Sequence, residues 1–350
     1  MDVDLKKTYT IKLWSFEIEI LNLKKTSIVE HLQAISVFLN LLFISSGVVI
    51  VPWLTILLLY TRLWFLVPLY AAWIYYDRHT AFNGGRKINW IRRMRLFKHF
   101  RDYFPVTLIK TTELPPDKNY LFITYPHGVL PMSVLANFAS EANECESKIF
   151  PGIDLRIITL DVNFYTPIAR EYFMSLGGCA ASESSLIHLL TSKPSKSVVL
   201  VAGGAAEAGL ARPGNTCSII TSRRKGFVRI ALKTGVSIVP MFSFGENNLY
   251  DQYNTRWLTV CKDIVYRVTG IQLILPKGRG FFQNSFGILP QRKRINTVVG
   301  KPIPIPKIEN PSKEQIDEYH SKFFKELYSL FEKYKHDYDP AGSNAKLIMQ

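Results

Sequence analysis

Residues 121–130 read LFITYPHGVL, an apolar run that stops abruptly at Tyr125-Pro126-His127-Gly128. A short run rich in β-branched and aromatic residues predicts a buried strand. The proline and the glycine predict that the chain turns directly after it. Open α/β sheets bind their ligands at the carboxyl ends of their strands, so His127 stands where chemistry is expected. A histidine at a turn is also often structural or solvent-exposed, and these ten residues alone do not separate the two alternatives.

The surrounding sequence predicts an α/β domain over residues 79–338. Its strand candidates are residues 120–124, 155–160, 197–202 and 236–244. A helix is predicted over residues 226–234, ending at Gly235, and a final helix begins at Ser312, where Gln315 completes a capping box. Short apolar runs that alternate with helical patterns indicate a central mixed sheet flanked by helices. Residues 339–350 are expected to form a flexible tail.

An apolar block precedes this domain. Residues 33–61 carry no charge, and a second apolar run covers residues 63–76. The first run alone is longer than the roughly 20 residues that one membrane-spanning helix needs. Because Pro52 would kink or end a helix, residues 32–78 are predicted to form a transmembrane or re-entrant helical hairpin. A buried helix pair in a soluble core and a single tilted span with the remainder lumenal are the alternatives.

Basic residues on both sides of the hairpin predict its orientation. They are Lys24 and Lys25 before it, and Arg86, Lys87, Arg92, Arg93, Arg95 and Lys98 after it. Because cytosolic flanks are enriched in lysine and arginine, we expect residues 1–31, the α/β domain and both termini to be cytosolic. The charged first twenty residues lack a small-residue cleavage site, so no signal peptide is expected and the apolar block is expected to stay as an anchor.

The composition narrows the class of partner. The 350 residues are 47% hydrophobic and carry a formal net charge of +15, which indicates an anionic partner. A mean hydropathy of +0.06 favours a membrane surface or a phosphate-bearing small molecule over nucleic acid. The four cysteines, Cys145, Cys179, Cys217 and Cys261, form no CxxC pair, and the histidines show no metal-ligand spacing with them. Reduced thiols and no metal site are therefore expected.

Five motifs together resemble a known family. They are RDYFP (101–105), YPHG (125–128), VAGGAAEA (201–208), RKGFVRIALKTGVSIVPMFSFGEN (224–247) and TVVGKPIPIPK (297–307). In order and spacing they are similar to the diacylglycerol acyltransferase 2 and monoacylglycerol acyltransferase family, which includes wax-alcohol acyltransferases. The resemblance covers nearly the whole chain. It implies transfer of a fatty acyl group from acyl-CoA to a hydroxyl of mono- or diacylglycerol, or alternatively to a long-chain alcohol.

The resemblance also implies a location and a set of partners. The expected location is the endoplasmic reticulum membrane, with the lipid droplet surface as a second one. The expected partners are acyl-CoA, an acylglycerol and membrane lipids, with acyl-CoA a co-substrate and no cofactor or metal. No nucleic acid partner is expected, and homo-oligomerisation stays open.

His127 falls on the second histidine of the family's His-Pro-His-Gly signature. A neutral imidazole is a suitable base for an alcohol that attacks a thioester directly. This sequence departs from the family at Tyr125, which replaces the first histidine, and at Lys277, which replaces a later one. These changes leave His127 as the histidine of the recognised motifs. They also leave open a catalytically weak lipid-binding or scaffold protein.

A carboxylate is expected to orient the His127 ring. The wider glycerolipid acyltransferases use an aspartate five residues after the histidine, but Met132 occupies that position here. The resemblance makes Glu207 the first candidate and Glu171 the second. A carboxylate at a helix N-terminus for Glu207, and an exposed helix charge for Glu171, are the structural alternatives.

Glycines and cations of the motifs are candidates for substrate binding. The glycines permit close backbone approach to a thioester or phosphate, although a tight turn explains them equally well. The cations could bind a coenzyme A phosphate or form a solvated or lipid-facing cap. The expected residues are Pro126, Gly128, Gly203, Gly204, Arg223, Arg224, Lys225, Glu246 and Asn247. Within the first apolar run, Phe38, Leu39 and Leu41 match a neutral-lipid contact pattern, for which plain anchoring is the alternative.

Overall fold

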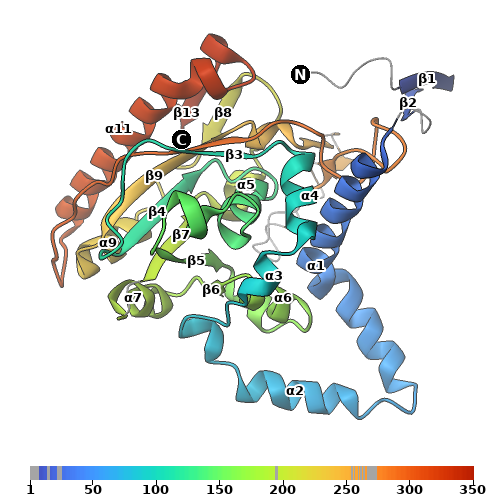
Figure 1. Cartoon of the computed structure of the whole chain (residues 1–350), viewed down its shortest axis with the longest axis horizontal. Coiled ribbons are helices and arrows are strands. Elements are labelled where there is room, and N and C mark those ends of the chain that lie inside the picture. Colours follow the sequence, from blue (N-terminus) through green and yellow to red (C-terminus); the bar gives the residue numbers. More distant parts are fainter. Residues whose placement is uncertain are drawn as a thin grey trace.

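The computed structural model describes residues 8–13, 16–21, 26–193, 196–253, 255, 257–258, 260, 262, 265 and 274–350. Within them the largest sheet has seven strands in the order β3-β12-β9-β4-β7-β5-β6 (Figure 1). The strands are β3 (Thr107–Lys110), β4 (Tyr120–Tyr125), β5 (Asp154–Thr159), β6 (Gly178–Ala180), β7 (Lys196–Val201), β9 (Ser237–Phe244) and β12 (Asn296–Val299). β12 pairs antiparallel with β9 and parallel with β3, and the other pairs are parallel. The predicted α/β class with a mixed sheet is confirmed.

Strand β4 lies inside the sheet, hydrogen-bonded to β7 on one side and to β9 on the other. All six of its residues are buried, as its unbroken apolar pattern predicts. Successive side chains point to opposite faces. Leu121, Ile123 and Tyr125 therefore join the core on one face, and Tyr120 and Phe122 join the core on the other.

Three helices pack on the face that carries Tyr125. They are α7 (Glu183–Thr191), α9 (Gly226–Thr234) and α11 (Lys313–Tyr338). α9 ends at Gly235, whose φ of +71° is in the left-handed region. α11 begins after Ser312 with the capping box to Gln315, and its Phe323 is fully buried. Both predicted helix boundaries are confirmed.

Short helical elements cover the opposite face. They are α3 (Asn89–Arg92), α4 (Arg95–Tyr103), α5 (Met132–Val134), η3 (Leu135–Ala139), η4 (Cys145–Ile149), η5 (Asp161–Phe164) and α6 (Ala169–Ser175). Arg92, which is 1% exposed, donates to both carboxylate oxygens of Glu146 at 2.9 and 3.0 Å. A buried guanidinium needs such a partner, because an unpaired buried charge is strongly destabilising.

The apolar block forms helix α1 (Ile28–Leu59) and helix α2 (Leu66–Tyr76). The hairpin differs from the prediction, since α1 continues through Pro52 and the chain turns at residues 60–65. A proline removes only one helical N–H, which a long apolar helix tolerates. By length and composition Ile28–Ser46 is long enough to cross a membrane, whereas Ile50–Leu59 is shorter. The first half of α1 packs against α4 and α6, and α2 projects from the domain with no buried residue (Figure 1).

The C-terminal tail is ordered, which corrects the expectation of a flexible end. β13 (Lys346–Met349) pairs in parallel with β8 (Thr216–Ile219). Leu347 and Met349 pack against the core that contains α9 and α11, which gives the segment apolar contacts as well as backbone hydrogen bonds. The smaller remaining elements are β1 (Thr8–Leu13), β2 (Phe16–Leu21), η2 (Thr80–Phe82), α8 (Gly204–Ala208), η6 (Glu246–Asn248), β10 (Asp251–Gln252), β11 (Pro276–Lys277) and η7 (Gly342–Asn344).

Cys145, Cys179 and Cys217 are free thiols. Two predictions from the sequence concern residues outside the described ranges, namely the reduced thiol at Cys261 and the basic pair Lys24 and Lys25.

Candidate active site

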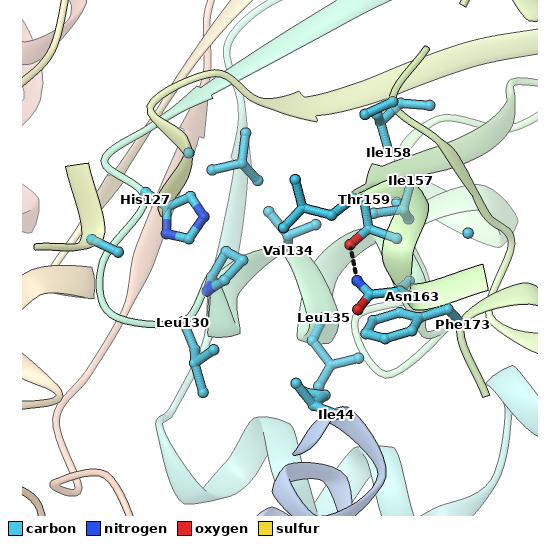
Figure 2. A pocket seen from close by; sticks show the side chains of 18 of the residues that line it. Ile44, His127, Leu130, Val134, Leu135, Ile157, Ile158, Thr159, Asn163 and Phe173 are labelled. Carbon is cyan, nitrogen blue, oxygen red and sulfur yellow. Dashed lines mark hydrogen bonds between the residues drawn. The ribbon is translucent and has the colours of Figure 1, made fainter. Parts of the chain in front are cut away.

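The turn after β4 places His127 at the wall of a cavity of about 370 Å³ (Figure 2). The cavity lies at the carboxyl ends of β4, β7 and β5, where an α/β sheet is expected to bind its ligand. Its wall is mostly apolar and includes Ile44, Leu130, Val134, Leu135, Ile157, Ile158 and Phe173. His127, Thr159, Asn163 and Tyr172 supply the polar side chains.

The His127 ring is held by its own loop. Nδ1 lies 3.0 Å from the carbonyl oxygen of Gly128. Because a carbonyl oxygen only accepts, Nδ1 carries the proton and Nε2 keeps a free lone pair. Burial lowers the pKa of His127 below its usual 6.5, and the positive charge of the nearby Arg224 lowers it further. The hydrogen bond to the Gly128 carbonyl opposes this shift. The ring is therefore neutral near pH 7 and able to accept a proton.

Gly128 allows this loop to form. Its φ of +62° is in the left-handed region, and a Cβ there would lie 2.9 Å from Cγ of Glu246. Both the backbone conformation and the space therefore require glycine. The sequence predicts that Gly128 makes room for a substrate, whereas in the structure the space beside it is occupied by Glu246.

Glu207 fixes the main chain at His127. Its side chain is 1% exposed, and its Oε1 accepts the His127 backbone N–H at 2.6 Å. Oε2 accepts the Ile220 backbone N–H at 2.9 Å. Burial raises the pKa of Glu207 to about 7, and the two N–H groups oppose that rise. The carboxylate thus holds the backbone of the loop, whereas the prediction had it orient the imidazole ring.

The two glycines after β7 make room for side chains of the protein. A Cβ at Gly203 would lie 2.3 Å from Cδ of Glu207. Gly204 has a φ of +64°, and a Cβ there would lie 3.2 Å from Nη2 of Arg224. Gly204 lines the cavity and Gly203 does not. The predicted close approach of a ligand to the backbone therefore stays open for Gly204 only.

The basic triplet divides into three different environments. Arg224 donates from Nη2 to the carbonyl oxygen of Gly203 at 2.8 Å, and its buried Nε has no partner among the described residues. Lys225 pairs with Asp317 on α11 at 2.5 Å. Arg223 is exposed to solvent. Arg224 is thus the member of the triplet that lies beside the His127 loop.

Glu246 braces the other end of the loop. It is 1% exposed and accepts the backbone N–H of Met132 at 2.7 Å and that of Ser133 at 3.2 Å. Burial raises the pKa of Glu246 to about 8, against the opposing effect of these hydrogen bonds. Asn247 donates to Sγ of Cys217 at 3.4 Å and, like Pro126, faces a smaller hollow outside the cavity. The structure thus shows Glu246 bracing the loop, and substrate contact stays a prediction for this residue.

Glu171 does not reach the cavity. Its carboxylate accepts from the Tyr70 hydroxyl at 3.1 Å, from Trp73 Nε1 at 3.2 Å and from Arg170 Nη1 at 2.8 Å. These contacts join α6 to α2. Glu171 therefore connects the apolar hairpin to the domain, and the prediction that it orients His127 is wrong.

Tyr125 also lies away from the cavity. Its ring is fully buried against α11, with centroids 6.5 Å from Phe323 and 5.7 Å from Phe324. The alternation along β4 puts Tyr125 on this face and lets the turn carry His127 to the cavity. Neither the hydroxyl nor the ring can contact a ligand in the cavity. Lys277, on β11, is exposed and does not line the cavity either.

Helix α1 contributes to the wall through a residue that the sequence did not single out. Ile44 lines the cavity, whereas Phe38, Leu39 and Leu41 do not. Phe38 packs edge-on against Phe281 with centroids 5.2 Å apart. The buried Asn40 in the same motif accepts a hydrogen bond from the Tyr172 hydroxyl at 2.6 Å, which fastens α1 to α6.

Three further residues of the cavity wall were not predicted from the sequence, namely Thr159, Asn163 and Phe173. Thr159 ends a predicted strand, and the sequence rule that placed His127 at a strand end applies equally to it. Phe173 follows Glu171 by two residues, but nothing in its sequence context marks it. Among the described residues, no group of three or more His, Cys, Asp or Glu side chains could hold a metal ion.

The chain is similar in sequence to known proteins over most of its length. The family model for diacylglycerol acyltransferase matches residues 56–350. Human diacylglycerol O-acyltransferase 2-like protein 6 is 42% identical over 304 residues, covering 85% of this chain and 90% of that protein. Mouse 2-acylglycerol O-acyltransferase 1 is 41% identical over 311 residues, covering 88% and 90%. Mouse acyl-CoA wax alcohol acyltransferase 1 is 40% identical over 322 residues, covering 91% and 97%.

Among solved structures, the 1-acyl-sn-glycerophosphate acyltransferase PlsC from Thermotoga maritima aligns with a TM-score of 0.39 and 13% identity, covering 87% of this chain and 97% of that one. The family assignment depends on the sequence matches. A family model that covers most of the chain, together with relatives about 40% identical over most of their own lengths, shows that the protein belongs to the diacylglycerol acyltransferase family and is an acyltransferase.

Proposed function

We propose that this protein transfers a fatty acyl group from acyl-CoA to the free hydroxyl of a diacylglycerol or monoacylglycerol, which makes triacylglycerol or diacylglycerol. The observation that carries the proposal is a neutral histidine, His127, at the wall of an apolar cavity in a chain of this family. The cavity provides space for an acyl chain, and the histidine provides a base for the hydroxyl.

His127 is the general base in the proposed reaction. Nε2 takes the proton of the acceptor hydroxyl while its oxygen attacks the thioester carbonyl carbon. The new C–O bond forms, the C–S bond breaks, and the imidazolium returns the proton to the departing thiolate of coenzyme A. The thioester is already activated, so direct transfer needs no covalent acyl-enzyme. A positioned base of this kind contributes about 10²- to 10⁴-fold to a rate.

The acceptor is proposed to enter from the bilayer along α1. Ile44 belongs both to the cavity wall and to the apolar segment long enough to span a membrane. Phe38, Leu39 and Leu41 lie one to two turns earlier on the same helix and are half-buried. We assign these three residues a role in anchoring α1 and in contacting lipid beside the cavity.

Coenzyme A is proposed to bind on the side of Gly204 and Arg224. Gly204 brings backbone close to the cavity, and Arg224 places a cation beside it. A guanidinium binds phosphate through paired N–H donors, and the unpartnered Nε of Arg224 is one such donor. Arg223 is exposed and could add to the attraction for a polyphosphate, whereas Lys225 is already paired with Asp317.

The proposed location is the endoplasmic reticulum membrane, with both termini in the cytosol. The lipid droplet surface is a second proposed location. The apolar α1 and the unburied α2 support a membrane hairpin. Tags at the two ends should both be digested when sealed microsomes are treated with protease. Protection of the C-terminal tag would contradict the hairpin topology.

The activity is tested with microsomes, labelled acyl-CoA and each acceptor in turn. We expect His127→Ala to lower ester formation by 10²-fold or more. His188→Ala, at an exposed position on α7, is the matched control and should retain activity. The proposal would be overturned if the unmodified protein formed ester no faster than the background rate with each of the acceptors.

A long-chain alcohol is the second candidate acceptor, which would make the product a wax ester. It is supported by the 40% identity to the mouse wax alcohol acyltransferase. A lipid-binding scaffold without activity was suggested by Tyr125 alone. That residue lies outside the cavity, so its presence does not argue against catalysis.

A further inference from the structure

The cavity wall carries one polar pair that the proposed chemistry does not use. Thr159 ends β5, and Asn163 follows on η5 (Figure 2). Asn163 donates from Nδ2 to the Thr159 Oγ1 at 2.9 Å. We call Thr159 and Asn163 the polar pair. The other polar wall residues already have roles, since His127 is the proposed base and the Tyr172 hydroxyl is bonded to Asn40.

The polar pair offers both a donor and an acceptor to a ligand. Among the described residues, Oδ1 of Asn163 and the hydroxyl hydrogen of Thr159 have no partner of their own. Neither side chain is fully buried, and both line the cavity. A carbonyl of a ligand could accept from Thr159, whereas a hydroxyl could donate to Asn163 and accept from Thr159 at once.

The sheet sets the separation between the polar pair and His127. β7 lies between β4 and β5, so the two outer strands are two spacings, or about 10 Å, apart. His127, Thr159 and Asn163 line one cavity, with His127 on one part of its wall and the polar pair on another (Figure 2). One hydroxyl at His127 and a second polar group at the polar pair can therefore belong to one small acceptor.

We propose that the polar pair selects the acceptor by binding a second hydroxyl, and that a monoacylglycerol is the favoured acceptor class. This inference rests on the proposed acyltransfer. A monoacylglycerol keeps one free hydroxyl when the other is at His127. A diacylglycerol presents only ester oxygens, which use the Thr159 donor alone, and a long-chain alcohol presents no second polar group. The expected order is monoacylglycerol, then diacylglycerol, then alcohol.

The test compares kcat/KM for monooleoylglycerol, dioleoylglycerol and hexadecanol within each variant, using the full chain in detergent or microsomes. Thr159→Val keeps the shape and removes the hydroxyl, and Asn163→Leu removes both amide groups. We expect each to lower the monooleoylglycerol-to-hexadecanol ratio by roughly threefold to tenfold, the effect of one hydrogen bond. A ratio measured within one preparation is independent of how much of the variant has folded.

Two controls separate selection from structure. Thr159→Ser retains the hydroxyl and should keep the original ratio. Thr166→Val removes a comparable local hydrogen bond, from Thr166 Oγ1 to the Val162 carbonyl at 3.0 Å, outside the cavity, and should also keep it. An equal loss for all three acceptors, or no change, would overturn the inference alone. If the unmodified protein esterifies none of the three acceptors, the proposed function is overturned, and this inference falls with it.

Discussion

The carboxylate of Glu207 accepts the backbone N–H of His127 at 2.6 Å and that of Ile220 at 2.9 Å. One buried side chain therefore connects the loop of the proposed base to the loop that precedes Arg224. Neither contact involves the imidazole ring. Glu207 holds the His127 loop in place, and its substitution should therefore affect both stability and the rate of the proposed reaction.

Glu207→Ala leaves two buried N–H groups without a partner. At about 1 to 3 kcal/mol for each, we expect the free energy of unfolding to fall by about 2 to 6 kcal/mol. Glu207→Gln retains one acceptor oxygen and should lose about half as much. Denaturation in detergent measures the stability, and ester formation by the folded fraction measures the rate. An alanine variant with unchanged melting temperature and rate would refute the positioning role.

Gly203→Ala tests the same contact from the other side. The φ of Gly203 is −61°, which an alanine can adopt without backbone strain. The destabilisation is therefore steric, because the new Cβ would lie 2.3 Å from Cδ of Glu207. We expect clear losses of stability and rate. Gly226→Ala is the matched control because its Cβ would meet nothing within 4 Å, and it should be neutral or stabilising by up to about 1 kcal/mol. Equal behaviour of the two variants would contradict the proposed packing.

The pH dependence of the rate should follow His127. Burial lowers the pKa of His127 below the usual value of 6.5. The imidazole therefore becomes protonated, and inactive as a base, only at a pH below 6.5. The rate kcat/KM is therefore expected to rise with pH through an inflection below 6.5 and to be level near pH 7. An inflection above 7 would mean that the histidine is protonated in the folded protein or that another group is limiting.

Tyr125→His restores the first histidine of the family signature but should not raise the rate. The side chain at 125 faces α11, so an imidazole there lies outside the cavity. Loss of the tyrosine packing against Phe323 and Phe324 should lower stability by about 1 to 3 kcal/mol. Tyr125→Phe should be nearly neutral, because the hydroxyl makes only a 3.5 Å contact to the Ile220 carbonyl. A large gain in rate for the histidine variant would place residue 125 at the reaction.

Deletion of residues 346–350 should impair catalysis although β13 does not line the cavity. The Gln350 carbonyl accepts the N–H groups of Thr221 at 2.7 Å and Ser222 at 3.0 Å, beside the Ile220 N–H that Glu207 binds. Because these contacts are made by the backbone, replacing Leu347 and Met349 with valine should preserve them. Full activity of the deletion variant, measured as ester formation, would show that the 220–224 loop needs no such support.

Much of the sheet could be predicted because its signals are local. The six-residue run of β4 and the capping box at Ser312 depend only on neighbouring residues, and both appear where the sequence places them. The turn of the hairpin could not be located in this way. Pro52 is a strong local signal, yet the surrounding helix accommodates it and the chain turns eight or more residues later.

The candidate site was predictable only where a motif marks a backbone turn. His127 and Gly128 belong to the turn after β4, and Glu207 binds the backbone of that turn. The role of Glu171 was missed because its partners Tyr70 and Trp73 lie about a hundred residues earlier in the chain. The environment of Tyr125 could not be predicted from the motif, because β4 ends at Tyr125 and the turn that follows carries His127 away from the core face on which the tyrosine packs.

Because Ile44 lies on α1, this helix affects how a fragment of the enzyme can be studied. The helix that would hold the protein in a lipid bilayer also closes one side of the cavity. A soluble fragment prepared without residues 28–59 would present an open-sided cavity, and inhibitors selected against it would be matched to the wrong shape.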